Sequence, residues 1–323
     1  MNQQQSSIYY AKIMLFGEYS VIKNSMALTV PYGHFNGELS YIFDNKYTDY
    51  DFAKQSNLEL YNLLGYFKKL QDQNSLISDF DVEAFAEDLN NGMYFESSIP
   101  EGFGIGSSGA LIAALFNRYV KNKPSPDQMI SKDMVELKNQ LAQLESFYHG
   151  TSSGIDPLNS YMKSPLLFEG NGEIRKVDIH LPAKNQDFAV FLLDSGNRGE
   201  TSPLVNIFLE KTKQSNKKGI DVEHLNAMTR RAIQSIIKGN NGEFFNALKG
   251  LSNYQLKLFD AMIPEGFHST WKKGLDTGKY YLKLCGSGGG GFLLGFTNDF
   301  PAVRKIMAQK DLEVIPVYVH QIR

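Results

Sequence analysis

The apolar positions in residues 131–150 predict one amphipathic helix. Met134, Leu137, Leu141, Leu144 and Tyr148 follow one another at intervals of three or four residues, the spacing of one buried helix face. At about 100° per residue, Glu145 lies on the same face, roughly 20° from Met134 and roughly 40° from Leu141. A carboxylate is rarely buried without a partner, so this position marks Glu145 as a candidate functional residue.

Apolar runs elsewhere predict strands and helices that do not alternate regularly. Strands are expected at residues 12–17 and 188–196, in the apolar runs on both sides of the glycines in 280–296, and at 312–320; further strand and turn are expected at 18–31. Helices are expected at residues 110–120, 203–215, 223–238 and 242–260. This irregular order predicts the α+β class. A change of composition at residues 181–186 predicts two domains, 1–184 and 185–323.

The composition is typical of a globular protein and argues against some classes of partner. The chain has 323 residues, of which 42% are hydrophobic and 21% charged, enough for a sizeable core and two domains. A formal net charge of -2 without a basic run argues against nucleic acid and membrane surfaces as partners. Cys285 is the only cysteine, and the first ten residues lack the features of a secretory signal, so we expect a cytoplasmic protein.

A glycine-rich loop stands before the helix expected at 110–120. The stretch "GFGIGSSGALIAALF" at residues 102–116 would present free backbone N–H groups at a helix start, which suits a phosphate. Gly104, Gly106 and Gly109 satisfy G-x-G-x-x-G, but Pro100 stands where a dinucleotide-binding fold needs a strand. No lysine follows as in a Walker A loop, and H-R-D and D-F-G are absent. The remaining interpretation is a loop that binds phosphate without a lysine of its own.

Three stretches in this order resemble a known superfamily. "KIMLFGEYSV" (12–21), "PEGFGIGSSGA" (100–110) and "KLCGSGGGGF" (283–292) are similar to the three motifs of the GHMP kinases, which include galactokinases, homoserine kinases, mevalonate kinases and phosphomevalonate kinases. The resemblance implies ATP-dependent phosphorylation of a small molecule. It also implies an N-terminal domain like ribosomal protein S5 domain 2 and a ferredoxin-like C-terminal domain.

A fourth stretch resembles one branch of this superfamily. "HGTSSGID" at residues 149–156 is similar to the H-G-[TN]-P-S-G-x-D segment of mevalonate kinases. The resemblance implies that Asp156 is the catalytic base and that Lys12 lies beside the acceptor hydroxyl. It further implies a magnesium-binding glutamate eleven residues before Asp156, which is Glu145. Helix periodicity and the resemblance therefore select Glu145 by separate routes.

The resemblance implies further site residues, cofactors and partners. The cofactors are ATP and Mg²⁺, and the partner is a small-molecule alcohol; a homodimer is left open. Either Ser107 or Ser108 supplies a hydroxyl to the metal while its neighbour caps the helix. The residues expected at the nucleotide phosphates are Gly102, Gly104, Gly106, Ser107, Ser108 and Gly109. The residues expected on the substrate side are Glu18, Tyr19, Thr201, Gly286, Gly288 and Gly289.

The chain also differs from the family pattern. Tyr19 replaces the histidine of G-E-H, Gly109 stands where alanine is usual, and Ser152 stands where the mevalonate kinase segment has proline. His149 is expected to be structural and Cys285 a small buried residue. The function expected is phosphorylation of mevalonate to 5-phosphomevalonate. The alternatives are a related kinase for a sugar or another hydroxylated metabolite, and a catalytically silent nucleotide-binding homologue.

Overall fold

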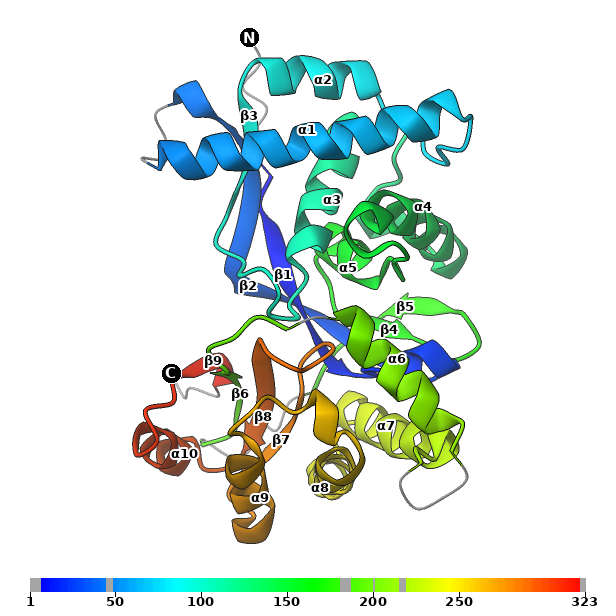
Figure 1. Cartoon of the computed structure of the whole chain (residues 1–323). Helices are drawn as coiled ribbons and strands as arrows, with labels where there is room; N and C mark the ends of the chain where they lie inside the picture. Colours follow the sequence, from blue (N-terminus) through cyan, green and yellow to red (C-terminus); the bar gives the residue numbers. More distant parts are fainter. Residues whose placement is uncertain (1–6, 45–48, 181–186, 200, 215–218, 320–323) are drawn as a thin grey trace. The chain divides into compact units, whose positions relative to one another are not determined.

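The chain folds into two compact units, and each unit is built from three separate stretches of the chain. The computed structural model describes residues 7–44, 49–180, 187–199, 201–214 and 219–319. The first unit comprises Met1–Lys12, Pro31–Pro100 and Gly106–Ser164, and the second comprises Ile13–Val30, Glu101–Ile105 and Pro165–Arg323. Strands β1 (Tyr9–Phe16) and β2 (Ala27–Tyr41) contribute residues to both units (Figure 1). The domains predicted at 1–184 and 185–323 stay a prediction.

The first unit is mostly helical. Residues Gly37–Tyr41 of β2 pair antiparallel with β3, α1 packs on β3 and on α2, and α3 packs on α4 and α5 (Figure 1). Asp49 and Asp81 accept hydrogen bonds at the starts of α1 and α2, which satisfies N–H groups that the helices leave free. The elements of this unit are β3 (Met93–Ser97), α1 (Tyr50–Asp72), α2 (Val82–Asn90), α3 (Ser107–Tyr119), α4 (Ser131–His149), α5 (Ile155–Met162) and the 3-10 turns η2 (Ile42–Asp44) and η3 (Pro126–Gln128).

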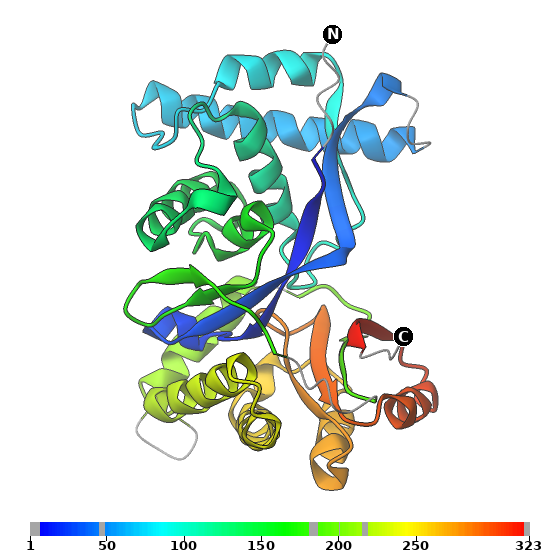
Figure 2. The same ribbon diagram turned by 180° about the vertical axis from the view of Figure 1, so that it is seen from behind.

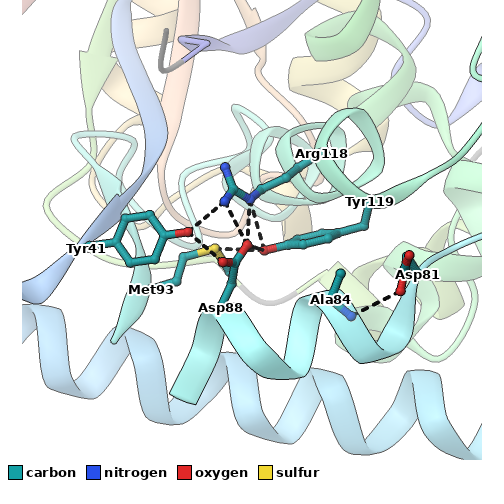
Figure 3. A network of polar contacts seen from close by, with 7 residues as sticks. All are labelled: Tyr41, Asp81, Ala84, Asp88, Met93, Arg118 and Tyr119. Carbon is teal, nitrogen blue, oxygen red and sulfur yellow. Dashed lines mark hydrogen bonds and ion pairs between the residues drawn. The ribbon is translucent and has the colours of Figure 1, made fainter. Parts of the chain in front are cut away.

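A polar network fixes the last turn of α3 to α2 and β2 (Figure 3). Arg118 donates hydrogen bonds to Asp88 at 2.8 Å and to the Tyr41 hydroxyl at 2.6 Å. The Tyr119 hydroxyl donates to the same carboxylate at 2.6 Å. Burial disfavours the ionised form of Asp88, yet the hydrogen bonds from Tyr119, Tyr41 and Arg118 outweigh it and lower the pKa of this carboxyl. The helix that begins in the glycine-rich loop is therefore anchored at its far end.

The second unit contains an antiparallel sheet in the order β7, β8, β6, β9. Helices α7 and α8 lie side by side in this unit (Figure 2), and residues Ala27–Thr29 of β2 pair with β4. Its elements are β4 (Leu166–Phe168), β5 (Ile174–Lys176), β6 (Ala189–Asp194), β7 (Tyr281–Leu284), β8 (Phe292–Thr297), β9 (Val314–Val319), α6 (Thr201–Thr212), α7 (Val222–Ile237), α8 (Asn241–Leu258), α9 (His268–Thr277), α10 (Phe300–Ala308), and the turns η1 (Ser20–Lys23) and η4 (Asp260–Met262).

Most of the elements expected from the sequence are present, and the α+β class is confirmed. The helix expected at 131–150 is α4, and its Met134, Leu137, Leu141 and Leu144 are buried as expected. The prediction for Tyr148 was wrong: it is 37% exposed, because it lies in the last turn of α4, beyond the buried part of the stripe. In the described part of the chain, no helix is long and apolar enough to cross a membrane.

Candidate active site

The glycine-rich loop ends in a helix whose first turn has no side-chain cap. Gly106 is the N-cap residue of α3, with a left-handed φ of 79° that favours glycine. The predicted serine cap was therefore wrong, because Ser107 and Ser108 already belong to the helix. The N–H groups of this first turn lack partners within the helix, so they can bind an anion together with the helix dipole.

Gly109 lets α5 approach the start of α3. A Cβ atom at Gly109 would lie 2.8 Å from the Cβ and the carbonyl carbon of Asp156, closer than non-bonded carbon atoms approach. A Cβ at Gly106 would lie 3.3 Å from Oδ2 of Asp156. The alanine usual in the family would not fit here without a shift of backbone. The glycine in its place explains how the Asp156 carboxylate comes to lie at the N-terminus of α3.

Lys12 and Asp156 form an ion pair at this helix start. The Nζ atom of Lys12, on β1, lies 2.8 Å from Oδ1 of Asp156, in the first turn of α5. The lysine side chain is 3% exposed and the aspartate 30%. A buried ammonium needs such a partner because its own hydration is lost. The aspartate carboxylate retains access to solvent, as a group that exchanges a proton with a bound molecule requires.

Glu145 is buried within hydrogen-bond distance of two hydroxyl groups. Its side chain lies on α4 and the residue is 3% exposed, which confirms the placement expected from helix periodicity. Ser108 Oγ donates to Oε1 at 2.9 Å, and Ser152 Oγ donates to Oε2. Burial raises the pKa of the Glu145 carboxyl from 4.5 to about 7, and the charge of Asp156 adds to the rise; the two hydroxyls and the Lys12 charge oppose it.

One of the two loop serines, Ser108, contacts Glu145. The Ser108 hydroxyl contacts Glu145 and also lies 3.2 Å from Nε2 of His149, so Ser108 is the serine that accompanies the glutamate. His149 was expected to be structural only, although it stands four residues after Glu145, on the same side of α4. The contact of Ser152 with Glu145 was not predicted either. Only the replacement of the family's proline marked Ser152 as unusual.

Glu145 and Ser108 fit a magnesium ion. Among the described residues, no group of three or more His, Cys, Asp or Glu side chains could hold a metal. Magnesium does not need such a group, because it keeps several waters and is bound by one or two carboxylates together with phosphate oxygens. A buried carboxylate and a hydroxyl, both hard oxygen donors, lie together 2.9 Å apart at the first turn of α3. This donor set is the kind that magnesium prefers.

The second unit brings another group of predicted residues together. A Cβ at Gly104 would lie 2.5 Å from the carbonyl oxygen of Cys285, so the backbones of residues 101–105 and 285–292 are in direct contact. Gly199 donates a backbone hydrogen bond to Gly102 at 2.9 Å. Cys285 is 1% exposed, as expected of a small buried residue. The predicted residues Gly286, Gly288 and Gly289 form the turn on which this contact is built.

Glu18 and Tyr19 are engaged in contacts within the second unit. Glu18 forms a fully buried ion pair with Lys283, from the strand before the second glycine turn. The Tyr19 hydroxyl donates to the carbonyl oxygen of Ser287, and its ring contacts Phe208. Burial, and then the charge of Glu18, raise the pKa of Tyr19. Thr201 begins α6, but its side chain lies outside what the structure describes. A role on the substrate side stays a prediction for all three.

Comparisons with known proteins identify a related N-terminal domain and similar folds. Residues 67–163 match the family model of the GHMP kinases N terminal domain. L. major mevalonate kinase in complex with R-mevalonate has a similar structure, with a TM-score of 0.65 and 16% identity over 99% of this chain and 98% of that one. Lactococcus lactis galactokinase complexed with galactose gives 0.62 and 11% over 98% and 94%.

A third similar structure is Streptococcus pneumoniae phosphomevalonate kinase in complex with phosphomevalonate and AMPPNP, with a TM-score of 0.60 and 15% identity over 96% of this chain and 98% of that one. A comparison with curated protein sequences gave no match. Residues 67–163 therefore match the N-terminal domain of the GHMP kinases, and the chain as a whole shares the fold of these solved kinases.

Proposed function

We propose that this chain is an ATP-dependent kinase that phosphorylates the alcohol group of mevalonate to form 5-phosphomevalonate. The observation that carries the proposal is the Lys12–Asp156 ion pair, 2.8 Å long, at the N-terminus of α3. Phosphoryl transfer needs a phosphate site, charge neutralisation and an oriented hydroxyl. The first turn of α3, Lys12 and Asp156 offer these three components within one unit.

In the proposed reaction, Asp156 accepts the proton of the acceptor hydroxyl. The hydroxyl oxygen then bonds to the γ-phosphorus, and the bond between this phosphorus and the bridging oxygen breaks, which releases ADP. The ammonium of Lys12 stabilises the negative charge that develops on the attacking oxygen. Glu145 and Ser108 would hold Mg²⁺, which supplies positive charge to the phosphate oxygens.

Mevalonate is proposed as the acceptor because two observations agree. Residues 149–156 resemble the mevalonate kinase segment, and a mevalonate kinase in complex with R-mevalonate shares the fold over 99% of this chain. The galactokinase complexed with galactose supports the alternative, a kinase for a sugar or another hydroxylated metabolite. A role in isoprenoid precursor synthesis and a cytoplasmic location belong to the same proposal.

The catalytically silent homologue is the less favoured alternative. A protein that only binds a nucleotide has no use for a base, whereas this chain keeps the Lys12–Asp156 ion pair and, at the same helix start, the hydrogen bond from Ser108 to Glu145. Glu145 is buried although burial raises its pKa, a cost to stability that a metal-binding role would explain.

A panel of acceptors with labelled ATP tests the proposal. The panel contains R-mevalonate, phosphomevalonate, galactose and homoserine, and each reaction is run with and without Mg²⁺. We expect Mg²⁺-dependent transfer of label to R-mevalonate at a higher kcat/KM than to the other acceptors. Transfer to galactose alone would replace the acceptor and keep the reaction. Absence of transfer to any alcohol, with ATP still bound, would favour the silent homologue.

A further inference from the structure

The loop between α4 and α5 places a hydroxyl that the family segment lacks against Glu145. Ser152 stands where mevalonate kinases have proline, and its Oγ donates a hydrogen bond to Oε2 of Glu145. Proline has no hydroxyl and cannot form this bond. The contact is therefore a feature of this chain and not one that the resemblance implies.

The Ser152 hydroxyl is oriented from both sides. The backbone N–H of Gly154 donates to Ser152 Oγ at 2.9 Å, so this oxygen is already an acceptor and its single hydrogen is directed to Glu145. The backbone N–H of Ser152 donates to Ser146 Oγ at 3.3 Å, which ties the loop to α4. These contacts give the hydroxyl one favoured orientation, and a polar group fixed in this way costs no reorganisation when a ligand binds.

The two oxygens of Glu145 have separate donors. Ser108 donates to Oε1, and Ser152 donates to Oε2. Ser108 lies in the first turn of α3 and would itself contribute an oxygen to the metal, whereas Ser152 lies in the loop after α4. The buried glutamate thus retains one hydroxyl donor that has no part in holding the metal. Such partners of a metal-binding carboxylate orient it, and their loss typically reduces metal affinity about 10–100-fold.

We propose that Ser152 is a positioning residue that holds the Glu145 carboxylate in the orientation that binds a divalent cation with the nucleotide. The inference rests on the proposed function, because it requires Glu145 to be a metal ligand. Ser152 acts only through Glu145 and does not contact the reacting atoms. The rival explanation is that Ser152 serves only to fold the loop, through the hydrogen bond from Gly154.

The test compares two isosteric replacements, Ser152→Thr and Ser152→Val, which differ in the hydroxyl alone. The affinity for Mn²⁺ is measured by electron paramagnetic resonance in the presence of AMPPNP. We expect the threonine variant to stay within about three-fold of wild type and the valine variant to lose about 10-fold or more. The control is Ser146→Ala, which removes another hydroxyl that holds the loop but donates its hydrogen to the Ala142 carbonyl oxygen and not to Glu145. We expect it to stay within about three-fold as well.

Three outcomes would count against these ideas in different ways. Equal Mn²⁺ affinity of the threonine and valine variants would overturn the inference alone. A loss in Ser146→Ala as large as in Ser152→Val would show that the loop fold is responsible, and would also overturn it. Failure of the wild-type protein to bind Mn²⁺ with AMPPNP would overturn the proposed metal site and the inference together. Melting temperatures without metal or nucleotide show that each variant folds, and Ser152→Ala replaces the valine variant if that one does not.

Discussion

At the scale of single residues, the most informative feature is a carboxylate kept in an unfavourable place. Glu145 lies on the face of α4 that also carries Leu141 and Leu144, and it is 3% exposed. Removal of its charge should therefore relieve a cost to folding even as it removes a proposed metal ligand. Stability and activity are expected to respond in opposite directions at this position.

For Glu145→Gln, we predict a loss of Mg²⁺-dependent turnover. We also predict that the variant becomes more stable relative to the wild type as pH rises. The folded wild type binds the Glu145 proton more tightly than the unfolded chain, so its stability falls as pH rises from about 4.5 to about 7. Glutamine does not titrate. Urea denaturation of the metal-free proteins should show the free energy of unfolding of the variant, relative to wild type, increasing over this interval and levelling above it. A difference that does not change with pH would contradict the raised pKa.

For the two loop serines, we predict unequal effects. Ser108→Ala should lower kcat/KM at limiting Mg²⁺ about 10-fold or more, because the Ser108 hydroxyl donates to Glu145 at 2.9 Å. Ser107→Ala is the matched control on the same helical turn, and it should remain within about three-fold. Steady-state kinetics over a range of Mg²⁺ concentrations make the comparison. Equal losses in both variants would refute the assignment of Ser108.

The sequence was sufficient to find some of these residues and not others. Glu145 could be predicted because helix periodicity depends only on neighbours along the chain. The contacts of Ser152 and His149 could not, because they depend on how residues 150–154 fold back toward α4 and α3. The exposure of Tyr148 could not be predicted for a similar reason. Its position on the periodic apolar face of α4 does not show where the elements that cover this face end.

At the scale of elements, the close packing of α3 on α5 positions the proposed base. The backbone around Asp156 lies so near Gly109 that an added Cβ would be 2.8 Å from it. Helix α5 begins at Ile155, after Gly154 in a left-handed conformation, and nearly all of its residues are buried. It therefore lacks the alternation of polar and apolar faces by which helices are recognised in a sequence, and it was not predicted.

For Gly109→Ala, we predict a loss of both stability and turnover. The added methyl group must displace the backbone of α5, which typically costs about 1–3 kcal/mol and moves Asp156. Gly65→Ala is the control, because Gly65 lies within α1 and has open space around it; it should stabilise the protein by about 0.5–1 kcal/mol. Chemical denaturation and kcat are the measurements. A fully active Gly109→Ala variant would show that this packing does not position the base.

For Asp88→Asn, we predict a stability loss that depends on pH. The network in Figure 3 lowers the pKa of Asp88 in the folded state, so its ionised form contributes stability above a pH of about 4 that is lost as pH falls through the folded pKa. The variant should lose about 1–3 kcal/mol at pH 7 and differ less from wild type in acid. Denaturation at pH 7 and pH 3 would show this. An equal deficit at both pH values would contradict the role of the charge.

At the scale of the whole molecule, chain order and spatial order differ. The first motif is divided: Lys12 belongs to the first unit, whereas Glu18 belongs to the second, where it pairs with Lys283. A change of composition along the chain cannot reveal such a division, because the division depends on contacts between residues far apart in the sequence. The fold itself could be predicted, because three ordered motifs together are far more specific than any one of them.

The measurement that tests the proposed reaction most directly is labelled phosphate transfer by Asp156→Asn, with nucleotide affinity measured in parallel. Asparagine keeps the size of the side chain next to Lys12 but cannot accept the proton of the acceptor hydroxyl. We predict that kcat with R-mevalonate falls about 10²–10⁴-fold while nucleotide affinity stays within a few-fold of wild type. Phosphorylation by the variant within a few-fold of the wild-type rate would contradict the assignment of Asp156 as the base.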